Sequence, residues 1–521
     1  MYRETMQSIF EQAFANYKDR VAIKFQNQEF TYSQLERVAN RCSWAMIERG
    51  IEPGDTCGLL MSNCPEMVIA DLAIMKAGSG KVPLNALLGE NEIKYILKDS
   101  EAKILFVGAN FFDIILRLKN DLPKLDYIVG ISDPKDCPSE FIPWSYFISL
   151  QSDENPTPKS KPEDLCLLAY TGGTTGLPKG VFHNQRNGYI NLCSHLIESE
   201  IRDGEKILVS TPLAHSAGLF TQTGWLRGAT IVIEDGFNPT RILEIIEREK
   251  ITFTFMVPTM IYRLLDQLKE KKYDVSSLNT IIYGAAPITV ERLKEGMSAF
   301  GPVFVQFFGQ TECPNFITKL SKEDHSLDPG KVDRLKSCGR PVLMSAVKVI
   351  DSEGKPVKIG EEGEIVVQSP YIMNEYYKLP DKTEETVRDG WLHTGDIGKI
   401  DEDGFVYLLD RKKDMIISGG FNVYSTEVEN AIQKHEDVSQ VAVIGVPDED
   451  WGEAVIAIVI PKREGAIKEE IIQFCGRYLS KYKRPKRIEF RSDFPLTPYG
   501  KIDKKELRKQ YSDLSKRQLK S

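Results

Sequence analysis

Residues 170–180 combine the residue types that bind a polyphosphate. They read Tyr-Thr-Gly-Gly-Thr-Thr-Gly-Leu-Pro-Lys-Gly, with four glycines, three threonines and one lysine. Glycine lets a backbone turn with positive φ and approach a ligand closely. Successive N–H groups in such a turn form a concave anion site, to which hydroxyl groups add donors. The spacing does not fit the usual G-x-x-x-x-G-K-[ST] loop, so we predict a phosphate loop of another kind. A flexible surface turn is the alternative, and it explains this composition poorly.

Three further segments carry groups that suit the other parts of a nucleotide. An aromatic ring stacks on a base, and Glu312 suits Mg²⁺, which prefers few carboxylates and leaves room for phosphate oxygens. Asp396 could bind a ribose diol, and Lys501 follows a Pro/Gly turn. Each residue alone has an ordinary explanation, such as a core ring, a surface acid, a helix cap or one lysine of a Lys-rich tail. The segments are Gln-Phe-Phe-Gly-Gln-Thr-Glu at 306–312, Gly-Trp-Leu-His-Thr-Gly-Asp-Ile-Gly at 390–398 and Pro-Leu-Thr-Pro-Tyr-Gly-Lys-Ile-Asp at 495–503.

Alternating apolar runs and helical stretches must position these segments. The order β-α-β-α predicts a layered α/β domain with a mostly parallel sheet. Thr31 with Gln34, or Ser33 with Glu36, could form a capping box at the start of one helix. Expected strands are 57–61, 104–107, 165–169, 207–210, 230–233, 252–257, 280–283 and 303–307, and expected helices include 65–77, 241–249 and 259–269.

The later part of the chain has a different pattern of predicted elements. Short strands with glycine turns over 347–367 predict a small β subdomain. The last hundred residues predict a separate α+β unit, with helices at 427–434 and 467–479 and strands at 441–446 and 454–460. A charge cluster at 410–414 separates the two parts. We therefore expect an α/β protein: a large N-terminal domain of layered α/β subdomains plus a small β subdomain at residues 1–412, followed by a small mobile α+β domain at 413–521.

Composition limits the function further. The 521 residues carry 67 Lys and Arg against 75 Asp and Glu, a net charge of −8, which argues against a general nucleic-acid binder. The nine cysteines are odd in number and contain no C-x-x-C, so they indicate free thiols rather than a disulfide framework or a zinc site. We find no signal-peptide core and no apolar run that spans a bilayer. We expect a cytoplasmic protein, with peripheral membrane contact left open.

Taken together and in order, the motifs resemble those of the adenylate-forming superfamily, which includes acyl-CoA synthetases, firefly luciferase and peptide-synthetase adenylation domains. The resemblance implies a two-step reaction. A carboxylate attacks the α-phosphate of Mg·ATP to give an acyl adenylate and pyrophosphate, and a thiol, usually that of coenzyme A, then displaces AMP. The matching segments are 31–32, 76–78, 82–85, 170–180, 212–218, 284–287, 308–312, 390–396, 410–413, 419–429 and 495–501.

The same resemblance implies roles for residues of the N-terminal part. The phosphate loop would contain Thr171, Gly172, Gly173, Thr174, Thr175, Gly176 and Lys179. The rest of the ATP or AMP site would contain Gly284, Ala285, Ala286, Gln306, Phe308 and Gly309, with Asp396 and Arg411 on the ribose. Thr311 would contact the α-phosphate, and Glu312, with Thr171, would hold Mg²⁺. His215 would lie near the acyl site, unless it is an ordinary core histidine.

The resemblance also implies that the C-terminal domain rotates between the two steps. Lys501 would bridge the carboxylate and the α-phosphate in the first step only. Lys413 would act as the hinge, because a few residues absorb the change of φ and ψ in such a motion. Gly419, Gly420 and Phe421 would then replace Lys501 and guide the thiol of coenzyme A.

Aromatic residues at 212–225 and 283–316 are expected to line the acyl pocket. An apolar pocket with a few polar groups favours a medium- or long-chain fatty acid first and an aryl acid second. An acyl-AMP ligase that loads a separate carrier protein would share every first-step residue. A luciferase-like oxygenase and a non-enzymatic nucleotide sensor are further alternatives, and the sequence does not indicate an oligomeric state. The expected walls are Phe220, Trp225, Phe307, Phe308 and Phe316.

Overall fold

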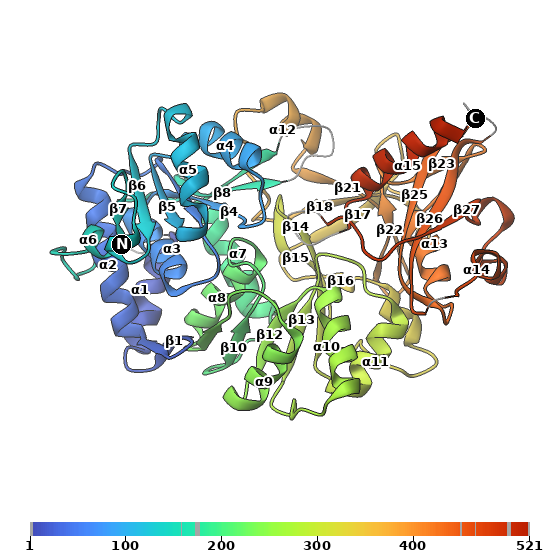
Figure 1. The fold of residues 1–521 in the computed structure, drawn as a ribbon, viewed down its shortest axis with the longest axis horizontal. Coiled ribbons are helices and arrows are strands. Elements are labelled where there is room, and N and C mark those ends of the chain that lie inside the picture. The colour runs from blue at the N-terminus through green and yellow to red at the C-terminus, as the bar shows by residue number, and fades with distance from the viewer. Residues whose placement is uncertain are drawn as a thin grey trace.

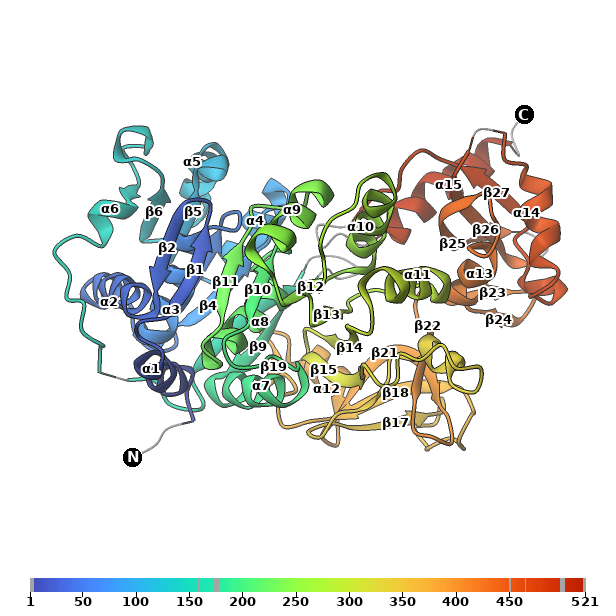
Figure 2. The same cartoon turned by 90° about the horizontal axis from the view of Figure 1, so that it is seen from below.

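The computed structural model describes residues 4–157, 159–171, 178–448, 451–463, 465–496 and 502–518. A large N-terminal part contains two broad sheets covered by helices and a smaller sheet beside them. The C-terminal unit lies at one end of the molecule in both views (Figures 1 and 2). The expected α/β class, with a large N-terminal part and a small C-terminal part, is confirmed.

One broad sheet has eight strands and delivers the phosphate loop. Its order is β19-β9-β8-β4-β3-β5-β6-β7. The strands β4-β3-β5-β6-β7 run parallel, as does β8 beside β4, whereas β9 pairs antiparallel with β8 and β19. Their bounds are β3 Thr56–Leu60, β4 Gly80–Leu84, β5 Ile104–Gly108, β6 Tyr127–Ile131, β7 Ile142–Pro143, β8 Leu165–Thr171, β9 Lys179–Asn184 and β19 Glu375–Tyr376.

The other broad sheet has nine strands, in the order β16-β15-β14-β13-β12-β10-β11-β1-β2. Its central strands are parallel, and β14 turns back into antiparallel β15. The bounds are β1 Val21–Phe25, β2 Gln28–Thr31, β10 Lys206–Val209, β11 Thr230–Ile233, β12 Phe253–Met256, β13 Thr280–Tyr283, β14 Phe304–Gln310, β15 Cys313–Leu320 and β16 Arg340–Pro341.

Helices connect the strands and cover the sheets. The expected capping box is present at the start of α2, where Thr31 Oγ1 accepts from the Gln34 amide and Gln34 Oε1 accepts from the Thr31 amide. The helices are α1 Met6–Asn16, α2 Tyr32–Glu48, α3 Pro65–Ala77, α4 Glu90–Asp99, α5 Phe112–Leu118, α6 Trp144–Phe147, α7 Gln185–Glu198, α8 Ser216–Leu226, α9 Pro239–Glu249, α10 Pro258–Glu270, α11 Val290–Phe300 and α12 Pro380–Thr386.

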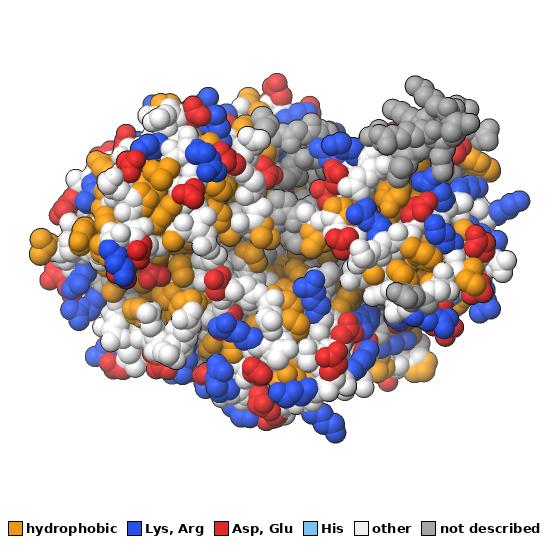
Figure 3. Space-filling view, viewed as in Figure 1, with side chains coloured by type: hydrophobic (Ala, Val, Ile, Leu, Met, Phe, Trp, Pro, Cys, Tyr) orange, Lys and Arg blue, Asp and Glu red, His pale blue; other side chains and the backbone are white. Residues whose placement is uncertain are grey.

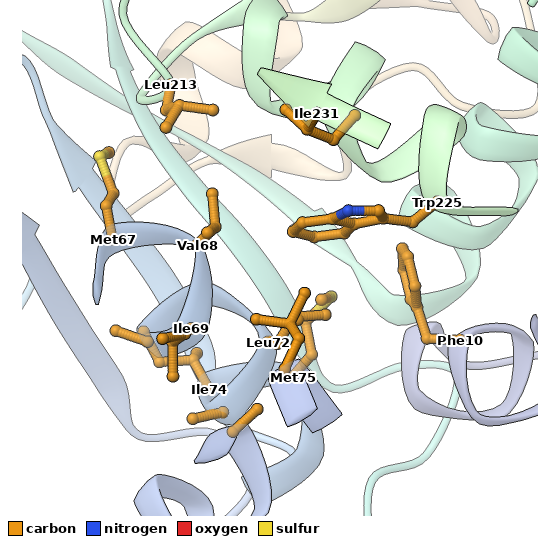
Figure 4. Close-up of a cluster of buried hydrophobic side chains, with 14 of the residues drawn as sticks. Phe10, Met67, Val68, Ile69, Leu72, Ile74, Met75, Leu213, Trp225 and Ile231 are labelled. Atoms are coloured by element: carbon orange, nitrogen blue, oxygen red, sulfur yellow. The ribbon is translucent and has the colours of Figure 1, made fainter. Parts of the chain in front are cut away.

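Helix α3 lies in the largest apolar core, which joins the two broad sheets. Side chains of α3 such as Val68 and Leu72 lie opposite Leu213, Trp225 and Ile231 in this core (Figure 4). Nearly every residue of α3 is buried, which explains why this helix is apolar on all sides. None of the described helices has the length and apolarity needed to cross a membrane.

The small β subdomain is an antiparallel sheet of β17-β18-β21-β20 with β22 beside β21. Its last strand, β22, ends at Arg411, inside the charge cluster at 410–414. The bounds are β17 Ala346–Ile350, β18 Gly363–Gln368, β20 Val387–Arg388, β21 Trp391–Ile400 and β22 Val406–Arg411.

The C-terminal unit has its own sheet, β24-β23-β26-β25 with β27 beside β26. The paired strands β25 and β26 extend beyond the expected 441–446 and 454–460, because they form one long antiparallel hairpin. The helix expected at 467–479 ends at Cys475, just before Gly476. The bounds are β23 Ile416–Ser418, β24 Phe421–Val423, α13 Ser425–Ile432, β25 Val438–Asp448, β26 Gly452–Pro461, α14 Lys468–Cys475, β27 Arg487–Phe490 and α15 Lys504–Gln518.

Charge is mixed on the face of the molecule seen in Figure 3. Acidic and basic side chains are interspersed over both the N-terminal part and the C-terminal unit there. The described part of this face therefore does not carry the clustered basic footprint of a nucleic-acid-binding surface.

Candidate active site

The tip of the β14–β15 hairpin is the centre of the candidate site. Gln310 pairs with Cys313, so Thr311 and Glu312 form the two-residue connection between the strands. His183, on β9 of the other broad sheet, places its Nε2 2.8 Å from the carbonyl oxygen of Thr311. A carbonyl only accepts, so Nε2 carries the proton. Burial lowers the pKa of His183, which keeps the ring neutral. This contact ties the hairpin tip to the strand that follows the phosphate loop.

Lys179, Tyr376 and Glu312 meet beside this tip. Lys179 Nζ lies 3.6 Å from the centroid of the Tyr376 ring, and the Tyr376 hydroxyl donates to Glu312 Oε1 at 2.7 Å. Burial and the Glu312 carboxylate raise the pKa of Tyr376, so the phenol stays a donor. Burial lowers the pKa of Lys179, and Glu312 opposes that shift. A cation and a carboxylate are thus held on two sides of one aromatic residue.

The phosphate loop leaves and re-enters the eight-stranded sheet at one place. Thr171 at the end of β8 and Lys179 at the start of β9 are cross-strand partners, so the two ends of the expected loop lie side by side. Gly172, Gly173, Thr174, Thr175 and Gly176 lie outside the described residues. The same holds for Lys501, although its neighbours Leu496 and Ile502 form an isolated β-bridge.

The expected ribose pair is brought together by the small β subdomain. Asp396 on β21 and Arg411 on β22 are cross-strand partners, and Arg411 Nε lies 2.8 Å from Asp396 Oδ1. Gln310 of the hairpin donates through Nε2 to Asp396 Oδ2 at 2.7 Å and to the Thr394 carbonyl at 2.9 Å. The Asp396 side chain is buried, whereas that of Arg411 is nearly half exposed. The hairpin tip and the Asp396–Arg411 pair therefore form one connected polar unit.

The expected adenine residues lie at the carboxyl end of β13 and on β14. Gly284 follows β13 and approaches β14 so closely that an added Cβ would lie 2.7 Å from the Phe307 carbonyl oxygen. Ala285 has a φ of 66° and is exposed, and Ala286 is partly exposed. Gln306 accepts through Oε1 from the Tyr283 hydroxyl at 3.2 Å. In parallel α/β sheets, ligands bind outside the carboxyl ends of the strands, which is where these residues lie.

The other residues expected at the adenine site lie on β14. Phe308 is only 9% exposed and packs in an apolar cluster with Val181 and Tyr376, so its role as a stacking surface stays a prediction. At Gly309 an added Cβ would lie 2.4 Å from the carbonyl oxygen of Asn315. Only glycine fits this close approach of β14 to β15.

His215 lies where the two broad sheets meet. It precedes helix α8, and the Asn85 amide Nδ2, directly after β4, lies 2.8 Å from His215 Nε2. Because an amide nitrogen only donates, Nε2 is the acceptor and is not protonated. His215 is partly exposed, which distinguishes it from the fully buried His195 and places it on an accessible surface.

The expected acyl-pocket rings do not form an open wall. Phe220, Phe307 and Phe316 pack on one another with ring centroids 5.6–6.2 Å apart, and all three are buried. Trp225 lies elsewhere, with its ring against Phe14. Five helical residues correspond to a rotation of about 140° at ~100° per residue, so Phe220 and Trp225 lie on different faces of α8. Trp225 therefore does not join the packed phenylalanine rings, and its expected place in the acyl pocket stays a prediction.

The expected hinge lies between β22 and β23. Burial and the neighbouring Arg411 lower the pKa of Lys413. The adjacent Asp414 pairs with Arg508 of α15 at 2.7 Å. The Tyr424 hydroxyl, in the C-terminal unit, donates to Glu362 of the small β subdomain at 2.7 Å. The Tyr424–Glu362 contact thus joins the two parts of the molecule, whereas the Asp414–Arg508 pair lies within the C-terminal part.

Of the residues expected on the coenzyme A side, Gly419 and Gly420 connect β23 to β24, and Phe421 begins β24. Gly419 and Gly420 have φ values of 59° and 81°. Phe421 is 58% exposed, and its ring lies 4.9 Å from that of Tyr482. In this arrangement Phe421 packs on its own unit of the molecule.

Two family models match the chain. A model of AMP-binding enzymes matches residues 10–377, and a model of the AMP-binding enzyme C-terminal domain matches residues 427–501. The chain belongs to the AMP-binding enzymes. Its place in this family identifies the adenylate-forming superfamily that the motifs resemble.

Relatives of this AMP-binding enzyme act on different acids. A medium/long-chain-fatty-acid–CoA ligase from Mycobacterium tuberculosis is 36% identical over 514 residues, covering 96% of this chain and 89% of that protein. A feruloyl-CoA synthase from an Amycolatopsis species is 34% identical over 497 residues, covering 94% and 96%. The crystal structure of ATP-bound MatB from Rhodopseudomonas palustris superposes with a TM-score of 0.88 at 28% identity, covering 98% and 99%.

Two residues of this AMP-binding enzyme were missed by the sequence analysis. Gln310 lies inside the 306–312 motif. Its place between Gly309 and Thr311 was the only sequence feature that could have indicated a role in the site. Tyr376 stands in no motif that was recognised, and it reaches the site because β19 pairs with β9. Among the described residues no three His, Cys, Asp or Glu side chains form a metal cluster. A single carboxylate at Glu312 fits Mg²⁺ that arrives with phosphate ligands.

Proposed function

We propose that this protein is an ATP-dependent acyl-CoA synthetase, an acid–thiol ligase that forms AMP. It would activate a carboxylic acid as the acyl adenylate with release of pyrophosphate, and then transfer the acyl group to coenzyme A. The observation that carries the proposal is the meeting of Lys179, Glu312 and the Gln310–Asp396–Arg411 unit around the Thr311 hairpin. A cation for phosphate, a carboxylate for Mg²⁺ and a carboxylate for a ribose diol lie around one point.

The first step brings two anions together and therefore needs positive charge and N–H donors. Lys179 supplies a cation, and the turn that Thr171 and Lys179 enclose would supply donors to the β- and γ-phosphates. Thr311 would contact the α-phosphate. Mg²⁺, held by Glu312 and, in our proposal, Thr171, would neutralise charge on the phosphates when bound. No general base is needed, because a carboxylic acid is already ionised at neutral pH.

Lys501 gives the sharpest test, because its proposed role belongs to one step only. Replacing Lys501 with Ala should abolish ATP–pyrophosphate exchange while thioester formation from preformed acyl adenylate continues. The matched control is Lys505→Ala, four residues later in the same Lys-rich tail, which should leave both steps intact. Equal loss of both steps in the Lys501 variant contradicts the proposal.

The acid itself is proposed from the relatives and the apolar surroundings. We propose a medium- or long-chain fatty acid first and an aryl acid second, since relatives of similar identity act on each. A panel of acids, read by kcat/KM for AMP release that depends on both acid and coenzyme A, distinguishes them. AMP release that needs a carrier protein instead of coenzyme A would favour the alternative, an acyl-AMP ligase that loads a separate carrier.

A further inference from the structure

We infer that Asp71, Lys81, Thr221 and Gln222 form a buried polar site for a neutral oxygen, a hydroxyl or a carbonyl group, carried on the chain of the acid. The inference rests on the proposed function and names its substrate class more closely. We call these four residues the chain-oxygen site. They come from helix α3, strand β4 and helix α8, on the face of α8 away from the packed phenylalanine rings.

An ion pair stands at the centre of the chain-oxygen site. Lys81 Nζ lies 2.8 Å from Asp71 Oδ1 and donates to Asp71 Oδ2 at 2.9 Å. Gln222 Nε2 donates to the same Oδ2 at 3.0 Å. The Lys81 and Asp71 side chains are only 15% and 13% exposed. An ion pair removed from water is weak evidence for a stabilising role, because desolvation offsets much of the Coulomb attraction.

Two polar atoms of α8 remain unused beside the pair. Thr221 and Gln222 are 1% and 2% exposed, and neither Thr221 Oγ1 nor Gln222 Oε1 has a hydrogen-bond partner in the described part of the chain. Buried polar groups are normally hydrogen-bonded, and one left unpaired costs stability. A hydroxyl that accepts from Thr221 and donates to Gln222 Oε1 would satisfy both, whereas a keto oxygen, which only accepts, would satisfy Thr221 alone.

Space adjoins these atoms on both sides. One small cavity is lined by Lys81 and Gln222 together with Leu219 and Pro314, the latter directly beyond the Glu312–Cys313 end of the hairpin tip. The second is lined by Lys81, Asp71 and Thr221 together with Leu213. Lys81 borders both cavities. Apart from these polar residues, side chains such as Leu219 and Leu213 make the surroundings apolar.

The position along the acid follows from two elements. His215 and Asn85 are in contact, and in our proposal they mark the carboxylate end of the site. Thr221 lies six residues beyond His215 on α8, a rise of about 9 Å. Lys81 lies four residues before Asn85 on β4, about 13 Å in an extended strand. Both elements place the chain-oxygen site roughly 10 Å from the carboxylate end, along the chain of the acid.

The charge of the site selects a neutral oxygen. Asp71 and Lys81 already balance, so a second carboxylate on the acid would bring an uncompensated negative charge into a buried region. A plain alkyl chain would instead leave Thr221 and Gln222 unpaired. Either mismatch lowers kcat/KM relative to an acid with a hydroxyl or keto group at the matching carbon.

The test compares each straight-chain acid with its mono-hydroxy, mono-keto and dicarboxylic counterparts of equal length, with the oxygen moved along the chain. In the wild-type protein one hydroxy or keto position should raise kcat/KM about 10- to 100-fold, the range for a hydrogen bond to a charged group. The double variant Asp71→Leu with Lys81→Met removes both charges together, and Thr221→Val removes a hydroxyl at nearly constant shape. Both should lose the preference while still activating the unsubstituted acid.

A matched control removes a different buried ion pair. Glu198 on α7 and Lys319 on β15 lie 2.9 Å apart with side chains 10% and 20% exposed, and neither lines the two cavities. The double variant Glu198→Gln with Lys319→Met should keep the wild-type preference. Loss of preference in this control as well would assign the effect to general destabilisation and overturn the inference.

A second measurement separates the inference from the proposed function. The shift in Tm caused by each acid without ATP should be larger for the preferred hydroxy or keto acid than for its parent, and equal in the Asp71/Lys81 variant. If acids are adenylated without any preference, the chain-oxygen site is wrong and the proposed function stands. If no acid is adenylated, the proposed function fails. The Tm shifts then decide the chain-oxygen site alone: equal shifts for the substituted acid and its parent in the wild type overturn this site.

Discussion

At the scale of single residues, the site depends on contacts between side chains of opposite character. Tyr376 touches the Lys179 ammonium with its ring face and the Glu312 carboxylate with its hydroxyl. The tyrosine therefore contacts both a cation and an anion, and the Glu312 carboxylate favours the charged form of Lys179. In the proposed function the cation would contact phosphate and the carboxylate would hold the metal.

Glu312 is expected to matter most in the first step. Glu312→Gln removes the carboxylate but keeps the size of the side chain, so ATP–pyrophosphate exchange should fall about 10²- to 10³-fold, as expected for losing several kcal/mol of charge stabilisation. Tyr376→Phe removes only the hydrogen bond that orients this carboxylate, and its loss should be about tenfold. A smaller loss in Glu312→Gln than in Tyr376→Phe would contradict the assignment of the metal to Glu312.

Lys179 should give the reaction an alkaline limit. Burial holds the pKa of Lys179 below its ordinary value of 10.5, so the ammonium loses its proton at a lower pH than a free lysine does. Since phosphate binding needs the cation, KM for ATP should be lowest below that pKa and rise as the pH increases through it. Lys179→Arg should move this limb to higher pH, because a guanidinium stays protonated. If KM for ATP rises at the same pH in Lys179→Arg as in the wild type, another group causes that rise.

At the scale of elements, a buried polar chain holds α7, α8 and β15 together beneath the hairpin. Ser216 donates to Asn315 Oδ1 at 2.8 Å, and Asn315 Nδ2 donates to His195 Nε2 at 2.9 Å. His195 Nδ1 donates to the Asn191 carbonyl at 2.8 Å. Because Nε2 accepts, the chain requires the neutral ring. The start of α8, which carries His215, is thereby fixed relative to the strand that follows Glu312.

The neutral ring that these hydrogen bonds require predicts that the protein loses stability in acid. Burial lowers the pKa of His195, and of the equally buried His325, from 6.5 to about 4. Between these two pH values the unfolded chain binds protons that the folded chain does not. Stability is therefore complete above about pH 6.5 and falls as the pH drops towards 4, by on the order of 3 kcal/mol for each histidine.

Denaturant unfolding between pH 8 and 4.5 measures this loss. His325→Gln should reduce the slope of stability against pH below pH 6.5, whereas above pH 7 the difference between variant and wild type should stay constant. A variant with the wild-type slope in the acid range would show that His325 does not take part.

At the scale of the whole molecule, the two broad sheets meet where the active site is proposed. His183 and Asn85 come from the eight-stranded sheet, and the Thr311 hairpin and His215 come from the nine-stranded sheet and its helix α8. The small β subdomain adds Asp396 and Arg411. The C-terminal unit is attached near Lys413 and touches the rest through contacts such as Tyr424 with Glu362.

A hinge at Lys413 predicts that backbone freedom there, rather than charge, is required. Lys413→Pro fixes φ near −65° and restricts the preceding residue, so it should slow one half-reaction at least about tenfold relative to the other. Lys413→Ala removes the charge but keeps the freedom, and both half-reactions should stay within a few-fold of the wild type. Separate assays of ATP–pyrophosphate exchange and of thioester formation from acyl adenylate measure this. A proline variant that affects both steps equally would remove Lys413 as the hinge.

Several features follow from local sequence. The strand and helix positions of the N-terminal part, the capping box at Thr31 and the motifs that led to the family depend on residues close in the chain. The mixed α/β architecture follows from the order of these elements. The cytoplasmic location, the domain boundary at 412/413 and the oligomeric state were not tested by the fold, and the first two stay predictions.

The sequence by itself therefore determined the chemistry, because glycines, a lysine and a glutamate at fixed spacing have few other uses together. Tertiary structure alone decided which residues complete that chemistry. Tyr376 meets Glu312 across 64 residues of chain, and Asp71 meets Gln222 across 151. The periodicity of apolar residues shows which face of a helix or strand is buried. It does not show which other helix or strand that face packs against. For that reason the packed phenylalanine rings, the position of Trp225 against Phe14 and the residues of the proposed chain-oxygen site could be located only once the two sheets were placed against each other.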